Sequence, residues 1–196
     1  VGATPILIDC KKDSYEMDYD QMEKAINEKT KVIIPVDLAG VVCDYDKIFE
    51  IVERKRSLFR PSNNPIQFAI GRVIVMSDAA HAFGVVKDGV SAANFGDASM
   101  FSFHATKVFH TIEGGCVCYH DETLTEKLTD IRNFGQHGQE ECLYVGGNAK
   151  MNEFQAAMGI CNLRHIEEEI AKRGEAVKRY RQRLSGVPGI RLAEPQ

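Results

Sequence analysis

The feature that most constrains the fold is the alternation of short β-branched runs with longer amphipathic runs along the chain. This alternation is typical of α/β folds, in which helices connect the strands of a largely parallel sheet. We expect strands at residues 6–9, 31–36, 72–76, 98–103 and 115–119. We expect helices at residues 18–27, 44–54, 121–133, 151–162 and 165–184. The sequence therefore predicts a three-layer α/β sandwich with a mostly parallel central sheet.

Two segments interrupt this alternation. Residues 57–71 contain two prolines and two adjacent asparagines, which is typical of an inserted surface loop. Residues 185–196 place glycines and prolines around a short apolar stretch, which is typical of a linker. We therefore expect one large domain over residues 1–186 and a linker over residues 187–196. The chain opens directly into a strand and stops after a linker, so we expect a fragment that is incomplete at both ends.

Composition narrows the functional class. The formal net charge is −4 at pH 7, and the basic residues are dispersed apart from the short run at residues 53–56, so we expect no nucleic-acid partner. No apolar run approaches the ~20 residues that cross a bilayer, so we expect a cytoplasmic protein without membrane contact. The six cysteines lack the paired spacing of a zinc site, so we expect buried free thiols and no bound metal.

The first candidate site residue is Asp78, at the end of the apolar run VIVM and a serine. Open α/β sheets bind ligands at the carboxyl ends of their strands, so an acid there is a candidate ligand contact. It is equally a candidate for capping a following helix or accepting backbone N–H groups, and the segment alone leaves both readings open. His81, taken alone, is more typical of a half-buried structural histidine than of a catalytic one.

The second candidate is Lys107, which follows the strand at residues 98–103. Taken alone, a lysine at a strand exit is more typical of a surface cation than of a functional amine. However, pyridoxal phosphate requires an amine that forms a Schiff base, a carboxylate that keeps the pyridine nitrogen protonated, and donors around its phosphate. Lys107, Asp78 and Ser102 supply one of each, and the Thr106 hydroxyl also flanks the lysine.

Five segments carry a family resemblance, in order and in spacing: DAAHAFG, FGDASMFSFHATK, EGG, IRNFGQHG and GGNAKMNEFQAAMG. Together they resemble the DegT/DnrJ/EryC1/StrS family of sugar aminotransferases, which depend on pyridoxal phosphate. This family has the fold of the aspartate aminotransferase superfamily, known as fold type I. The resemblance covers nearly the whole chain and implies that the predicted sandwich is the cofactor-binding large domain of such an enzyme.

The resemblance implies a role for each candidate. Lys107 would hold the cofactor as a Schiff base and carry the proton between the substrate carbon and the cofactor. Asp78 would pair with the pyridinium nitrogen, His81 would lie near the ring and its phenolic oxygen, and Ser102 would bind the phosphate. Asn148 would reach the phosphate of the neighbouring subunit's cofactor, so a homodimer with shared active sites is implied. Without the resemblance, Asn148 reads as a turn or cap residue ahead of a helix.

The implied reaction moves an amino group from an amino acid, expected to be glutamate, to a nucleotide-linked keto sugar, as in polysaccharide biosynthesis. Two alternatives stay open: a sugar dehydratase that uses the same cofactor, and a non-catalytic binding or regulatory relative. Dehydratases that resemble this family have histidine in place of the lysine, so Lys107 favours transfer. Two departures from the family's pattern concern the site. Ser77 stands where an acidic residue often precedes the aspartate. The family's segment before residue 1 and its C-terminal small domain are not in this chain.

Overall fold

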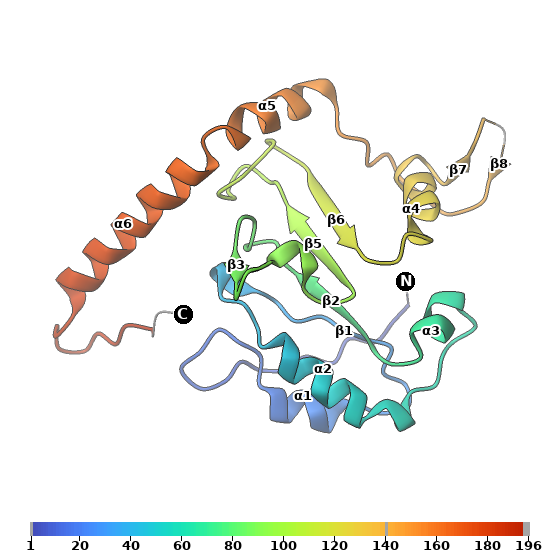
Figure 1. The fold of residues 1–196 in the computed structure, drawn as a ribbon, viewed down its shortest axis with the longest axis horizontal. Coiled ribbons are helices and arrows are strands. Elements are labelled where there is room, and N and C mark those ends of the chain that lie inside the picture. The colour runs from blue at the N-terminus through green and yellow to red at the C-terminus, as the bar shows by residue number, and fades with distance from the viewer. Residues whose placement is uncertain (1, 140, 194–196) are drawn as a thin grey trace.

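A four-stranded sheet forms the centre of the computed structural model, which describes residues 2–139 and 141–193 (Figure 1). Its strands, in spatial order, are β1 (Val32–Ile33), β2 (Ile74–Asp78), β5 (Ala98–Ser102) and β6 (Gly115–Tyr119). The β1–β2 and β2–β5 pairs are parallel, and the β5–β6 pair is antiparallel. The prediction of an α/β fold with a mostly parallel sheet is confirmed.

Helices and small hairpins connect and flank the strands of this sheet. The helices are α1 (Tyr19–Ala25), α2 (Tyr45–Arg54), α3 (Pro65–Ile70), α4 (Leu124–Arg132), α5 (Glu153–Leu163) and α6 (Ile166–Leu184). The two hairpins pair β3 (Val86–Lys87) with β4 (Val90–Ser91), and β7 (Gln136–His137) with β8 (Glu141–Cys142). Short 3₁₀ turns cover Leu38–Gly40, Arg56–Leu58 and Ala92–Asn94. In Figure 1, α5 and α6 form an arm that extends away from the sheet.

Side-chain caps explain where several helices begin. The Asp18 carboxylate accepts the N–H groups of Asp20 and Gln21 at the start of α1, as the sequence predicts. Asp121 instead accepts the Thr123 N–H and hydroxyl, so this aspartate forms a turn and α4 begins after it. A reciprocal capping box between Asn152 and Gln155 starts α5.

One face of the sheet packs on α1 and α2 and carries the larger core. Val73 and Val75 of the β2 region, Ile33 of β1, and Ile48 and Val52 of α2 are buried in a single apolar cluster. Figure 1 shows α1 and α2 side by side along this face. Removing these β-branched side chains from water is the main stabilisation that this layer provides.

The other face of the sheet is more open. Because side chains alternate along a strand, Val32, Ile34 and Val36 point away from the buried Ile33, and they are 38%, 51% and 44% exposed. The strand register places Asp78 on this same face, since Val36 pairs with Asp78. The open face therefore combines apolar side chains with the predicted site carboxylate.

The predicted strand at residues 6–9 is wrong, and the predicted loop at residues 57–71 is wrong in part. Residues 6–9 form no strand, because they pair with no other strand in the described chain, and Ile6 and Leu7 remain 68% and 92% exposed. The predicted loop at residues 57–71 contains α3, which Asn64 caps and Gly71 ends with a left-handed φ of 65°. Asn, Pro and Gly at these positions are helix-boundary signals that the sequence analysis attributed to a loop.

The described cysteines are all free, but only Cys43 is buried. The expectation of buried thiols is therefore wrong for the exposed Cys10, Cys116, Cys142 and Cys161. Among the described helices, none has the length and apolar character needed to cross a bilayer. The last part of the predicted linker, residues 194–196, lies outside the described residues.

We expect Ile48→Ala to lower the free energy of unfolding by about 2–5 kcal/mol, because Ile48 is 0% exposed in the core under the sheet and its removal leaves a cavity. Chemical denaturation monitored by circular dichroism would measure the loss. Glu50→Ala, on the exposed side of the same helix, is the control and should change stability by about 0.5 kcal/mol or less. Equal losses in the two variants would contradict this packing.

We expect His137→Gln to destabilise the protein more at about pH 5.5 than at about pH 9. His137 Nδ1–H donates a hydrogen bond to the Asp130 carboxylate at 3.0 Å, which raises the pKa of the histidine, and the charges of Asp130 and Glu126 add to the shift. A raised folded-state pKa gives stability that is present below the ordinary value of 6.5 and is lost as pH rises through the folded-state value.

Denaturation curves across this pH range would measure the difference between wild type and His137→Gln. His120→Gln is the matched control, because His120 is exposed and makes no hydrogen bond or ion pair within the described chain. A difference between wild type and His137→Gln that stays constant with pH would contradict the proposed ion pair with Asp130.

Candidate active site

Two neighbouring parallel strands bring the predicted acid and the predicted hydroxyl to one edge of the sheet. Asp78 is the last residue of β2, and Ser102 is the last residue of β5. Asp78 lies opposite Met100, so Ser102 lies two residues further along on the same face. The carboxyl ends of parallel strands are where α/β sheets bind ligands, and both side chains are half-buried there.

Asp78 is held by backbone hydrogen bonds to the segment that follows β1 and by a side-chain bond to Ala80. Its N–H donates to Pro35 O at 2.9 Å, and Asp37 N–H donates to Asp78 O at 3.0 Å. Its Oδ1 accepts the Ala80 N–H at 3.1 Å. One carboxylate oxygen therefore satisfies a backbone N–H, which is one of the two readings left open by the sequence. Oδ2 makes no hydrogen bond within the described residues, and the ligand contact stays a prediction.

Lys107 lies in the connection between β5 and β6, in a turn closed by its own N–H donating to His104 O at 2.9 Å. The side chain is half-buried, and within the described chain its Nζ makes neither a hydrogen bond nor an ion pair. Most lysines are solvated on the surface or paired with an acid. A half-buried amine without a partner is therefore available for chemistry.

A cavity of about 220 Å³ joins Lys107 to His81. Its lining residues are Ala39, Ala80, His81, Phe83, Thr106, Lys107, Val108 and Phe109. Phe83 and Phe109 stack with their ring centroids 4.4 Å apart and form an apolar wall. Asp78 and Ser102 do not line this cavity, although Asp78 is bonded to the lining residue Ala80. The structure thus brings His81 and Lys107 together and places Asp78 beside them.

Residues of the turn after β1 are part of this site, and the sequence analysis missed them. The Ala39 N–H donates to His81 Nδ1 at 3.2 Å, and Ala39 itself lines the cavity. Ala39 has a φ of 57°, a conformation that residues with a side chain rarely adopt. The available signal was the adjacent Gly40 between a strand and a helix, which marks a tight turn at a strand's carboxyl end.

The hydroxyls near Lys107 have few internal partners. Ser102 Oγ accepts the His104 N–H at a long 3.4 Å, and Thr106 Oγ1 lies 3.0 Å from His104 Nδ1. A hydroxyl that accepts from the backbone keeps its own hydrogen free to donate. Ser102 is therefore suited to donate to an anionic group at this edge of the sheet, whereas the Thr106 hydroxyl is paired with the His104 ring.

Asn148 lies apart from the cavity, on an exposed segment between β8 and α5. It forms an antiparallel bridge with Asn133, and Phe134 N–H donates to Gly147 O at 3.0 Å. The segments meet so closely that a Cβ on Gly135 would lie 1.8 Å from Tyr144 O, so only glycine fits there. The structure does not bring Asn148 to the Lys107 of its own chain.

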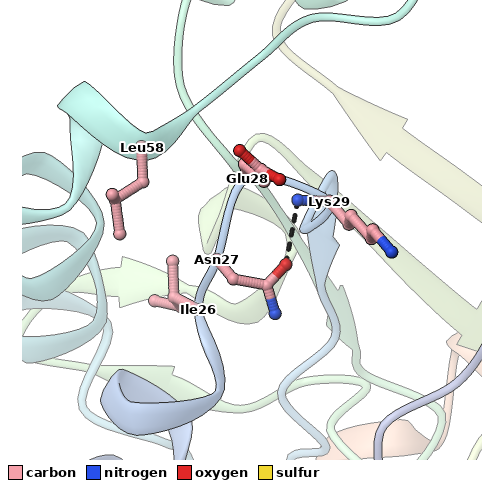
Figure 2. Close-up of a pocket in the computed structure, with 5 residues that line it drawn as sticks. All are labelled: Ile26, Asn27, Glu28, Lys29 and Leu58. Carbon is pink, nitrogen blue, oxygen red and sulfur yellow. Dashed lines mark hydrogen bonds between the residues drawn. The ribbon is translucent and has the colours of Figure 1, made fainter.

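A larger hollow of about 460 Å³ lies elsewhere, between the end of α1 and the turn at Arg56–Leu58 (Figure 2). It is lined by Ile26, Asn27, Glu28, Lys29 and Leu58. Asn27 Oδ1 accepts the Lys29 N–H at 2.9 Å, so the amide shapes its own turn rather than pointing to a ligand. None of the predicted site residues lies there, so the smaller cavity at Lys107 is the better candidate.

The residues in the smaller cavity, together with Asp78 and Ser102 beside it, fit pyridoxal phosphate. The cofactor needs an amine, a carboxylate and donors for its phosphate. Within the described residues, Lys107 offers an unpaired amine and Asp78 an oxygen without a hydrogen bond, and Ser102 and Thr106 offer hydroxyls. This fit rests on the donor set, and each residue's role at the cofactor remains a prediction.

Comparison with known proteins identifies the family of the chain. The model of the DegT/DnrJ/EryC1/StrS aminotransferase family matches residues 1–59 and 67–196. The unmatched residues 60–66 fall within the segment predicted to be an insertion. The dTDP-4-amino-4,6-dideoxy-D-glucose transaminase of Shigella dysenteriae is 34% identical over 194 residues, which cover 99% of this chain and 48% of that protein. GDP-perosamine synthase of Caulobacter vibrioides is 32% identical over 196 residues, 99% of this chain and 48% of that protein.

Solved structures show the same relationship. A putative sugar aminotransferase of Streptococcus pneumoniae, Spr1654, superposes in its PLP-form with a TM-score of 0.89 and 39% identity, over 95% of this chain and 49% of that one. Its PMP-form also gives a TM-score of 0.89, with 37% identity. This chain spans about half the length of the relatives it matches. Since the family model covers nearly all of its residues, the chain belongs to the DegT/DnrJ/EryC1/StrS aminotransferase family.

Proposed function

We propose that the complete protein carrying this chain is a pyridoxal phosphate-dependent aminotransferase. It moves an amino group from an amino acid, with glutamate as the expected donor, to a nucleotide-linked keto sugar. The observation that carries the proposal is the half-buried amine of Lys107, which is unpaired among the residues that the structure describes and lies in a cavity shared with His81, in a chain of this family. Residues 1–186 are the cofactor domain in this proposal, and residues 187–196 are the linker that leaves it.

When bound, the cofactor supplies a ring that accepts electrons from the substrate carbon. Lys107 Nζ would anchor it and then take and return the proton at that carbon, for which an amine unpaired within the described residues is suited. Asp78 would offer its open Oδ2 to the pyridine N–H and so favour the protonated ring. Ser102 and Thr106 would lie at the phosphate, and the stacked Phe83 and Phe109 would exclude water from one side of the cavity.

The sugar substrate is inferred from the relatives. Two of them are named for dTDP-linked and GDP-linked amino sugars, and a further relative, from Bacillus subtilis, is a spore coat polysaccharide biosynthesis protein. We therefore assign a nucleotide-linked keto sugar as the acceptor, in polysaccharide biosynthesis. We place the protein in the cytoplasm, which is supported by six free cysteines, a pattern typical of reducing compartments.

A homodimer with shared sites is part of the proposal. Asn148 lies outside the cavity of its own chain, which is consistent with a role at the cofactor of a second copy. Large apolar side chains near it are exposed, including Val145 at 101% and Phe154 at 85%. Exposed apolar side chains gathered in one region favour coverage by another protein surface.

The runner-up is a sugar dehydratase that uses the same cofactor. The unpaired Lys107 favours transfer, since relatives of the dehydratase type resembling this family carry histidine at that position. The two reactions differ in the first half of the cycle. Only an aminotransferase converts glutamate to its keto acid in the absence of sugar, so this half-reaction separates them.

We expect Lys107→Ala to abolish covalent trapping of pyridoxal phosphate. Borohydride reduction of the wild-type complete protein loaded with the cofactor, followed by peptide mass spectrometry, should place the added mass on the peptide that contains Lys107. The exposed Lys12 is the control, and Lys12→Ala should trap the cofactor as wild type does. An added mass on a peptide without Lys107 in the wild type, or undiminished trapping in Lys107→Ala protein, would overturn the assignment.

We expect Asp78→Asn to lower the rate of the glutamate half-reaction by about 10²–10³-fold, because the charge that favours a protonated ring is lost. The amide oxygen still accepts the Ala80 N–H, so the turn after β2 is retained. Single-turnover absorbance measurements give the rate, and borohydride trapping at Lys107 shows that the cofactor still binds. A rate within about threefold of wild type would remove Asp78 from this role.

A further inference from the structure

The carboxyl group of Asp37 lies directly behind the candidate active site. Asp37 is 0% exposed and follows β1 at the point where the backbone pairs with Asp78. Acidic side chains are rarely buried completely unless they are paired or hydrogen-bonded, because desolvation of the charge is costly. The transfer reaction proposed above makes no direct use of Asp37.

Three donors satisfy the Asp37 carboxyl group. The Cys43 N–H donates to Oδ1 at 2.9 Å, and the hydroxyls of Tyr45 and Ser77 donate to Oδ2 at 2.9 Å and 2.8 Å. Ser77 belongs to β2, and Tyr45 is the first residue of α2. One side chain therefore ties the β1–α2 connection to the strand that carries Asp78. Burial raises the pKa of Asp37, although these hydrogen bonds oppose the shift.

The segment that Asp37 closes is the tight turn Leu38–Gly40. Its own backbone adds bonds from Gly40 N–H to Asp37 O at 3.2 Å and from Val41 N–H to Leu38 O at 3.0 Å. Ala39 sits in this turn with a φ of 57°, where its Cβ is crowded by the backbone. Such a conformation persists when the surrounding bonds over-determine it, and such residues concentrate at functional sites.

This turn determines which nitrogen of His81 carries a proton. The Ala39 N–H donates to His81 Nδ1, so Nδ1 is the acceptor and the neutral ring carries its hydrogen on Nε2. Both Ala39 and His81 line the cavity that contains Lys107. Nε2–H is then the ring's donor, and no bound ligand is needed to select it.

We propose that Asp37 is a positioning residue: through the turn Leu38–Gly40 it fixes His81 as the Nε2–H form, ready to donate to an oxygen of the group bound beside Lys107. The last part of this inference rests on the proposed function, because the bound group is taken to be the cofactor. The placement of His81 by Asp37 does not depend on it, and it can be measured without any ligand.

Two nuclear magnetic resonance readouts test the placement in the full chain without cofactor. Long-range ¹H–¹⁵N spectra of ring-labelled histidine distinguish a protonated ring nitrogen from an acceptor, and His81→Gln assigns the His81 signals. Hydrogen exchange at the Ala39 amide reports its hydrogen bond to the ring. The amide of the buried Val52 in α2 serves as the internal reference for global opening.

Asp37→Ala should accelerate Ala39 exchange about tenfold relative to Val52, and the two His81 ring nitrogens should lose their separate acceptor and donor shifts. Asp37→Asn is the matched conservative variant. Its amide oxygen can accept the Cys43 N–H while its amide group donates to the Tyr45 and Ser77 hydroxyls, so near wild-type values are expected.

Three outcomes would overturn the proposal: a proton on Nδ1 in the wild type, an unprotected Ala39 amide in the wild type, or unchanged Ala39 and His81 signals in folded Asp37→Ala protein. If Asp37→Ala does not fold, Ser77→Ala and Tyr45→Phe decide the matter, because each removes one donor to Oδ2. Each should accelerate Ala39 exchange selectively, and no selective change in either variant would overturn the role of Asp37.

Lys107→Ala separates this inference from the proposed function. It should leave the Ala39 and His81 signals as in the wild type, since Lys107 makes no hydrogen bond to either residue. If Lys107 fails to trap the cofactor while His81 behaves as described, the function fails and the placement stands. If trapping succeeds while Asp37→Ala leaves His81 unchanged, the proposed function stands and the placement of His81 by Asp37 fails.

Discussion

The backbone pairing at the carboxyl end of β2 is the constraint on which the site depends. Asp78 exchanges hydrogen bonds with Pro35 and Asp37 on one side, and the Ala79 N–H donates to Met100 O at 2.9 Å on the other. A strand with a partner on both edges has little freedom to shift, because each displaced N–H or C=O would lose its partner in a buried setting. The Asp78 carboxylate is therefore positioned by the sheet itself, before any side-chain contact is considered.

Because side chains alternate along a strand, two neighbouring residues of β2 face opposite sides of the sheet. Ser77 points into the buried layer and meets Asp37, whereas Asp78 points to the open face. A polar residue that enters the core at Ser77 would be costly on its own, and the buried carboxyl of Asp37 satisfies it. The hydrogen bond between Ser77 and Asp37 also links β2 to the turn that contains Ala39. The contacts that hold His81 in place are therefore connected to those that hold Asp78.

Much of this arrangement follows from local sequence, and the exceptions have physical reasons. The strand at Gly115–Tyr119 has the predicted bounds, and Asp78 and Ser102 lie at strand ends as periodicity indicates. Residues 6–9 have strand-like composition, but a strand also requires a partner, which no local pattern reveals. The contact between Ala39 and His81 joins residues 42 positions apart, and a left-handed alanine has no composition signature. The sequence therefore could not show which residues far apart in the chain come into contact.

The loop that carries Lys107 shows how an unpaired amine can be held without a partner of its own. Phe103 and Phe109 contact edge to face with centroids 4.9 Å apart, and the Thr111 N–H donates to Phe103 O at 2.9 Å. The Asn162 amide of α5 donates to His110 O at 2.8 Å, so a distant helix closes the same loop. These contacts anchor both ends of the segment while leaving the lysine amine unbonded. An amine fixed through its backbone keeps its nitrogen available for reaction, whereas an ion pair would have fixed the position by occupying the nitrogen.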